Sequence, residues 1–133
     1  MSGMSALIGF TAWTLALVAL VVSWRVLEVL RGKAANSWGR GGAIAVPGLV
    51  TRAEHAHMNC IENLPVFAVV VLAAQALGKT AGVDALAAYV LYARIAQSVT
   101  HLVGTSHWLV LLRATFYSVQ IAIIAYLLWG LCA

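Results

Sequence analysis

A chain of 133 residues, of which 63% are hydrophobic and only 9% are charged, does not have the composition of a soluble domain. Its formal net charge of +4 does not indicate a nucleic-acid partner, because two of its few basic residues, Arg94 and Arg113, lie inside apolar runs. The length corresponds to one domain, residues 1–133. No cleavable signal peptide is predicted, because the first apolar run is too long and lacks a basic start.

Four apolar runs are each long enough to cross the bilayer core, which is about 30 Å thick and requires about 20 helical residues. They lie near residues 6–30, 49–77, 83–103 and 107–131. Helices are expected rather than strands, because in lipid every backbone polar group must be hydrogen-bonded internally. A very apolar soluble bundle is disfavoured, because the first and fourth runs have no polar face. The predicted fold is therefore all-α, an integral-membrane bundle of four transmembrane helices.

The basic residues of the connections predict how this bundle is oriented. The connection between the first two helices carries Arg31, Lys33 and Arg40, whereas the connection between the second and third offers only Lys79. The positive-inside rule therefore places the first connection in the cytoplasm and both termini outside. We expect a multi-pass protein of the bacterial inner membrane, with its active site toward the cytoplasm.

Several side chains near helix ends are expected to act locally. Arg25 and Glu28 have the i, i+3 spacing of an ion pair on the first helix. The third helix is expected to begin near Asp84, an acidic residue that suits a first turn. Cys60, in the middle of the second helix, and Cys132, at the chain end, are predicted to be free thiols.

The beginning of the second helix is strongly polar although it is expected to enter the membrane. At 100° per residue, its polar side chains form one stripe about 100° wide. The stripe consists of Arg52, His55, Asn59, Glu62 and Asn63. Ionisable groups at membrane depth are costly, so such a stripe normally faces a bundle interior or a wet cavity and marks a functional site. His57 lies off the stripe and is predicted to pack between helices or at the lipid interface.

The third and fourth helices carry one polar stripe each. These contain Arg94, Gln97, Ser98 and His101 on the third helix, and Arg113, Tyr117 and Gln120 on the fourth. The three stripes together hold three arginines against a single acid, Glu62, which predicts a site for an anion bearing carboxylates. A buried arginine beside the Tyr117 hydroxyl would also stabilise a thiolate.

Structural alternatives remain open for several of these residues. Arg52 taken alone is typical of an arginine that extends toward the membrane surface. An ion pair between Arg94 and Glu62 is as consistent with the pattern as ligand binding, and His101 fits packing as well as it fits a site. A metal site is not expected, because the rings of His55 and His57 lie about 200° apart on a helix.

The sequence TRAEHAHMNCIENLP of residues 51–65 resembles the motif E-R-x-x-R-A-x-x-N-x-x-E-N-x-P of the membrane-associated proteins in eicosanoid and glutathione metabolism. This family includes microsomal glutathione transferases, leukotriene C4 synthase and prostaglandin E synthase. The segments Tyr92-Ala93-Arg94 and Arg113-x-x-x-Tyr117 are also similar to family signatures. In length and helix number, the resemblance covers nearly the whole chain.

The resemblance implies a homotrimer that binds glutathione between adjacent subunits, with a lipophilic substrate entering from the surrounding lipid. Arg113 would activate the thiol, with Tyr117 alongside. The candidate glutathione-binding residues are Arg52, His55, Asn59, Glu62, Arg94, Gln97 and His101. The expected activity is that of a glutathione transferase or peroxidase acting on lipophilic electrophiles or lipid hydroperoxides.

The chain departs from the family pattern at three positions, and two other functions remain open. Thr51 replaces the motif glutamate, His55 replaces its second arginine, and His101 replaces a tyrosine that commonly lines the thiol end. An imidazole charges near neutrality, so the clamp at His55 is expected to be weaker or pH-dependent. The alternatives are a small proton-coupled exporter that uses Glu62, and a catalytically inactive family member that serves as a binding subunit.

Overall fold

The computed structural model describes residues 1–38 and 46–133, and the described residues form four helices and no strand. The helices are α1 (Gly3–Leu30), α2 (Gly48–Leu77), α3 (Thr80–Val103) and α4 (His107–Cys132). The prediction of an all-helical chain with four helices is confirmed. Arg40, which contributed to the predicted orientation, lies outside the described residues.

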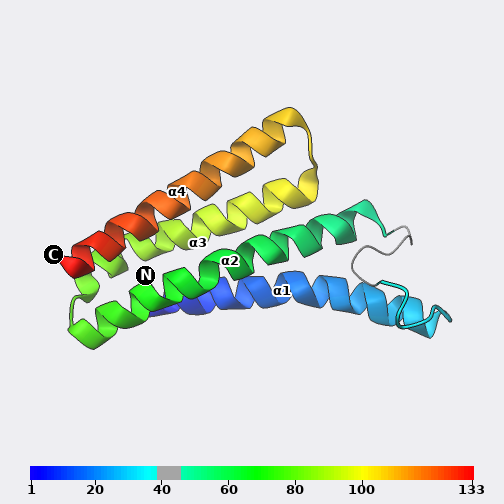
Figure 1. The fold of residues 1–133 in the computed structure, drawn as a ribbon, viewed down its shortest axis with the longest axis horizontal. Coiled ribbons are helices and arrows are strands. Elements are labelled where there is room, and N and C mark those ends of the chain that lie inside the picture. Colours follow the sequence, from blue (N-terminus) through cyan, green and yellow to red (C-terminus); the bar gives the residue numbers. More distant parts are fainter. Residues whose placement is uncertain (39–45) are drawn as a thin grey trace.

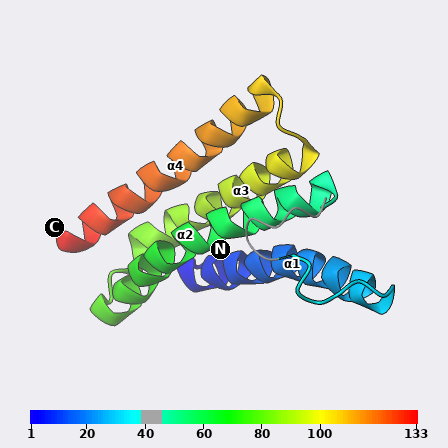
Figure 2. The same ribbon diagram turned by 45° about the vertical axis from the view of Figure 1, so that its right-hand side comes forward.

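The helices run alternately up and down, with both termini and the α2–α3 turn at one end of the molecule (Figure 1). Helix α3 packs against each of the other three, whereas α1 contacts only α2 and α3 within the described residues. Helix α4 lies beside α3 at the end that holds the C-terminus and diverges from it toward the α3–α4 turn, as both views show (Figures 1 and 2).

Three of the helices, α1, α2 and α4, are long and apolar enough to cross a membrane. Helix α3 has 24 residues but carries several polar side chains in its second half, which lowers its hydropathy. Most of these polar side chains are buried against the other helices: Arg94, Gln97, Ser98, Thr100 and His101. Polar side chains that pack against neighbouring helices are expected when polar groups must avoid lipid.

The apolar core lies mainly among α1, α2 and α3, and Ile124 and Leu127 of α4 complete it. Phe10 of α1 and Phe67 of α2 are fully buried, with their ring centroids 5.9 Å apart. Gly9 lets α1 approach α3 closely, because a Cβ atom at this position would lie 2.9 Å from the side chain of Leu91. Small residues commonly permit such close approach between membrane helices. Helix α4 buries Gln120, Ile124 and Leu127 and exposes most of its other large apolar side chains.

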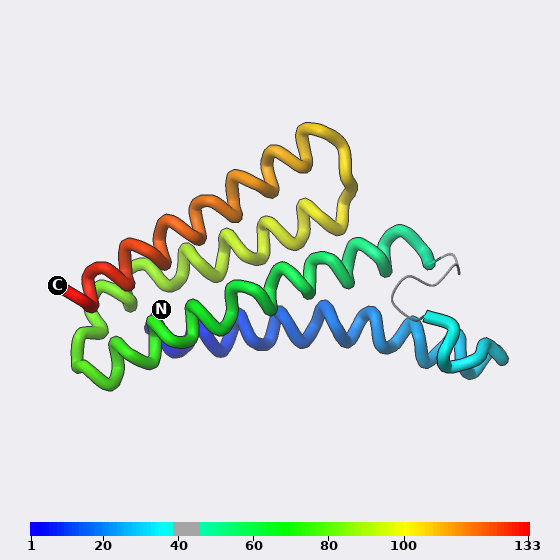
Figure 3. The backbone as a smooth tube through the Cα atoms, viewed as in Figure 1, coloured from blue at the N-terminus to red at the C-terminus, as the bar shows by residue number. Residues whose placement is uncertain are grey.

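Two local predictions about acidic residues were wrong. Helix α3 begins at Thr80, so Asp84 is not in its first turn; the Asp84 carboxylate instead accepts a hydrogen bond from the Gly3 N–H at the start of α1. Glu28 does not pair with Arg25, because residues after α1 turn back beside the helix end (Figure 3) and place Arg31 and Lys33 against its carboxylate.

Arg25 instead crosses to the second helix and pairs with Glu54 at 3.3 Å. Two other predictions are confirmed. His57 lies between helices, with its Nδ1 atom 3.1 Å from the Thr14 carbonyl oxygen of α1. Cys60 and Cys132 are free thiols, the first buried and the second exposed.

Candidate functional site

A pocket of about 280 Å³ opens between α2, α3 and α4. Five of its lining residues belong to the predicted stripes: Asn59, Glu62, Gln97, Arg113 and Tyr117. Helix α2 contributes Asn59 and Glu62, α3 contributes Gln97, and α4 contributes Arg113 and Tyr117. The tertiary structure thus brings polar residues from all three stripes to one cavity.

Three further residues of α4, Val110, Ala114 and Ser118, also line this pocket and were missed by the sequence analysis. Their spacing contained the necessary signal. Counted together with Arg113 and Tyr117, they follow the pattern i, i+3, i+4, i+7 and i+8, which is one face of a helix. Val110 and Ala114 carry no polar group and Ser118 lies beside the stripe of Arg113, Tyr117 and Gln120, so the polar pattern alone does not identify them.

A cluster of basic side chains adjoins the pocket at the α3–α4 end. We call Arg52, His55, His101 and Arg113 the basic cluster. The Nη1 atom of Arg113 lies 2.9 Å from Nδ1 of His101, and the ring centroids of His101 and His55 are 5.9 Å apart. Arg52 donates from Nε to the Leu102 carbonyl oxygen at 2.9 Å, which stabilises the negative end of α3. In the described part of the chain, no acid forms an ion pair with any of the four.

Arg94 lies in the interior of the subunit and does not line the pocket. Its side chain is fully buried, and within the described residues none of its three guanidinium nitrogens has a hydrogen-bond partner. The guanidinium carbon lies 5.3 Å from the centroid of the Phe10 ring. The suggested ion pair with Glu62 is not formed, because Glu62 is exposed at the pocket while Arg94 is directed toward α1.

The polar floor of the pocket is held by a hydrogen bond between two glutamines. Gln120 of α4 is fully buried and donates from Nε2 to Oε1 of Gln97 at 3.0 Å. Because Gln97 also lines the pocket, this bond fixes an amide group at its inner wall. A second bond, from Gln120 Nε2 to the Phe116 carbonyl oxygen, holds the amide of Gln120 in place.

The pocket between α2, α3 and α4 is chemically suited to a small zwitterionic ligand that carries an anionic centre. Arg113 offers guanidinium donors, Tyr117 offers a hydroxyl, and Glu62 offers a carboxylate for an ammonium group. Asn59 and Gln97 can both donate to and accept from peptide groups. Among the described residues, no group of three or more His, Cys, Asp or Glu side chains could hold a metal ion.

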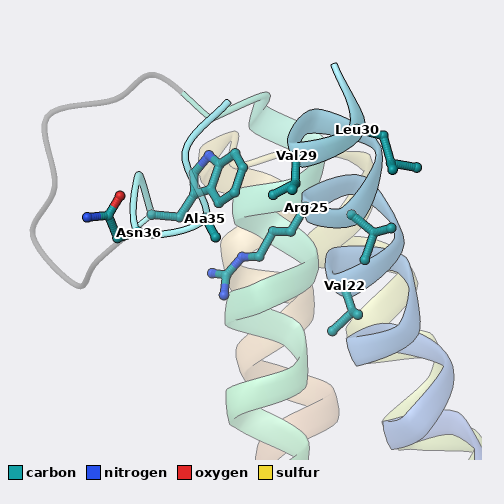
Figure 4. Close-up of a pocket in the computed structure, with 8 residues that line it drawn as sticks. Val22, Arg25, Val29, Leu30, Ala35 and Asn36 are labelled. Atoms are coloured by element: carbon teal, nitrogen blue, oxygen red, sulfur yellow. The ribbon is translucent and has the colours of Figure 1, made fainter. Parts of the chain in front are cut away.

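A larger pocket of about 500 Å³ lies elsewhere, between the end of α1 and residues 35–38 (Figure 4). Apart from Arg25 and Asn36, its lining is apolar or aromatic, and it contains none of the residues of the three stripes. We assign the functional site to the smaller pocket, because binding sites are distinguished by convergent polar groups rather than by volume.

Comparison with known proteins identifies the family of this chain. The sequence model of the MAPEG family matches residues 4–133, a range that includes every residue of the pocket and of the basic cluster. No curated protein and no solved structure matches the chain. Because the family match spans essentially the whole sequence, the chain belongs to the MAPEG family, the membrane-bound proteins of eicosanoid and glutathione metabolism.

Proposed function

We propose that the protein is a membrane-embedded glutathione transferase or peroxidase. It would bind glutathione, stabilise its thiolate, and direct the sulfur at lipophilic electrophiles or lipid hydroperoxides. The proposal rests on one observation: Arg113 and Tyr117 line the same pocket as Asn59 and Glu62 in a chain of the MAPEG family. These residues lie on two helices and are separated by about fifty positions in the sequence.

The groups of the site match the groups of glutathione. The tripeptide has one ammonium group, two carboxylates, two peptide units and a thiol. Glu62 would hold the ammonium group, and Asn59 and Gln97 would bind the peptide units. Arg52 and His55, at the basic end of the site, would take a carboxylate.

Chemistry would begin with loss of the thiol proton to solvent. The Arg113 guanidinium and the Tyr117 hydroxyl favour the anionic sulfur by charge and hydrogen bonding. In the transferase reaction the thiolate forms a C–S bond with the electrophilic carbon, and the leaving group departs with the electrons of the broken bond. In the peroxidase reaction two glutathione molecules are oxidised to the disulfide, while the hydroperoxide is reduced to an alcohol and water.

We further propose that the functional unit is a homotrimer in which α3 is the fourth membrane span. The pocket volume of about 280 Å³ lies just below the range for ligand pockets, which is about 300–1,000 Å³. A neighbouring subunit that covers the open side would enlarge and enclose the site. The exposed apolar side chains of α4, including Leu111, Leu112, Val119 and Ile121, would provide that contact or face the lipid from which the second substrate enters.

Thiolate formation tests this proposal directly. Ultraviolet difference absorbance on mixing glutathione with the purified protein should show a thiolate signal. Arg113→Ala should reduce this signal by at least about tenfold, because a nearby cation lowers the pKa of a thiol by about one unit or more. Arg25→Ala is the matched control, because Arg25 lies outside the site and pairs with Glu54. This variant should keep the signal.

Two other results would change the assignment. An undiminished signal in Arg113→Ala would contradict the proposed role of this arginine. Binding of glutathione by calorimetry without any thiolate signal would identify a catalytically inactive binding subunit. Proton flux in liposomes that is driven by a drug gradient and lost in Glu62→Gln would instead favour the exporter.

A further inference from the structure

The contact between Arg113 and His101 constrains the chemistry of both side chains. Nη1 of Arg113 lies 2.9 Å from Nδ1 of His101, and a guanidinium can only donate hydrogen bonds. The Nδ1 atom must therefore accept, which requires a neutral imidazole with its proton on Nε2. A protonated ring has no acceptor and would lose the contact.

The position of Arg113 in the fold makes this contact important. Helix α4 diverges from α3 toward the α3–α4 turn (Figure 2), and Arg113 lies in the second turn of α4, which begins at His107. His101 is the one hydrogen-bond partner of the Arg113 side chain among the described residues. His101 itself is 5% exposed in the last turn of α3 and is therefore held by packing. The buried side chain of His101 can thus fix the position of the half-buried Arg113 side chain.

Within residues 1–38 and 46–133, the titratable groups that face His101 are all basic. Arg52 and His55 approach from α2, and Arg113 approaches from α4. A carboxylate at position 101 would also hold Arg113, but it would form an ion pair and neutralise its charge. A neutral imidazole orients the guanidinium by one hydrogen bond and leaves the positive charge available for an anion in the pocket.

We infer that His101 is a positioning residue that accepts a hydrogen bond from Arg113 and directs its guanidinium into the pocket between α2, α3 and α4. This inference rests on the proposed function, since Arg113 is the group that stabilises the thiolate. It assigns His101 an indirect role, through Arg113, rather than direct contact with glutathione. It also explains how a chain with histidine at this position keeps an oriented arginine.

The test compares substitutions that differ in the acceptor they offer. In His101→Asn, the amide oxygen takes approximately the place of Nδ1 and can accept from Arg113. In His101→Leu, a side chain of similar bulk offers no acceptor. The glutathione thiolate signal at saturating glutathione should fall at least about tenfold in His101→Leu, because a hydrogen bond to a charged group is lost. His101→Asn should restore most of that loss.

The half-saturating glutathione concentration should change less than the signal amplitude, because the contact orients the thiolate-stabilising group and not the peptide. If His101→Leu does not assemble, His101→Gln replaces it. Its amide oxygen extends toward the position of Nε2, so it should not restore the signal, although it is as polar as asparagine.

The possible outcomes separate the two proposals. If Arg113→Ala keeps the thiolate signal, the proposed function fails. If Arg113→Ala loses the signal but His101→Leu matches the wild-type protein, the positioning role is overturned and the proposed function stands. Equal losses in His101→Asn and His101→Leu would also overturn it, because an acceptor at Nδ1 would then be insufficient.

Discussion

Replacing Arg94 by methionine should stabilise the subunit. Arg94 is fully buried, and in the described chain its three guanidinium nitrogens have no hydrogen-bond partners. Methionine is unbranched and of similar length, so it can fill the same space between α3 and α1 without polar atoms. Replacing even a buried ion pair by apolar side chains of similar volume is often neutral or stabilising by about 1–4 kcal/mol, and Arg94 has no ion-pair partner among the described residues.

The surroundings of Arg94 set the approximate size of this stabilisation. Each buried unsatisfied polar group costs about 1–3 kcal/mol, so three nitrogens without partners cost at least about 3 kcal/mol. The contact with the Phe10 ring, 5.3 Å away, returns about 2 kcal/mol as a desolvated cation–π interaction. The free energy of unfolding should therefore rise by about 1 kcal/mol, which corresponds to an increase in Tm of roughly 4 °C.

The buried thiol of Cys60 provides the assay. In a Cys132→Ser background, a maleimide dye that fluoresces on reaction reports heating-induced exposure of Cys60 alone. Arg25→Met is the control, because its ion pair with Glu54 is partly exposed and should be worth less than about 1 kcal/mol. A lower Tm in Arg94→Met, with the Tm of Arg25→Met unchanged, would refute the reasoning and show that the guanidinium stabilises the subunit.

Two further predictions concern packing and thiol accessibility. Gly3→Ala should lower the Tm, because the new Cβ atom would lie 2.6 Å from Cγ1 of Val83 and overpacking costs about 1–3 kcal/mol. The control is Gly82→Ala, in which the new Cβ atom has nothing within 4 Å. This substitution should leave the Tm unchanged or raise it, because alanine favours a helix more than glycine does. Equal effects of the two substitutions would contradict close packing at the start of α1. In the folded protein, maleimide labelling followed by mass spectrometry should modify Cys132 and leave Cys60 unmodified; rapid labelling of both would contradict the burial of Cys60.

The sequence was sufficient to predict the elements and the faces that carry the site. Four apolar runs, each long enough to cross the bilayer as a helix, predicted the four helices. Such runs can be recognised from local composition alone. The 3.6-residue period placed Asn59 and Glu62 on one face of α2, and Arg113 and Tyr117 on one face of α4. The tertiary structure then placed all four in the same pocket.

The choice of partners could not be predicted in this way. Arg25 had a suitable acid one turn away at Glu28, yet it pairs with Glu54 of another helix. Asp84 was placed at a helix start and instead binds the backbone of Gly3 in another helix. Sequence spacing predicts which residues are neighbours within one helix. The observed contacts join two different helices, so they depend on how those helices are placed relative to each other.

The sequence by itself determined that this is a membrane-type helical chain of the MAPEG family, with polar stripes on three helices. Only the tertiary structure decided that Arg113 is held by His101 while Arg94 remains buried without a partner among the described residues. The physical reason is the same in both cases. An arginine side chain is long and flexible, so its partner is set by the separation and direction of neighbouring helices, and the divergence of α4 from α3 is a property of packing that no local pattern encodes.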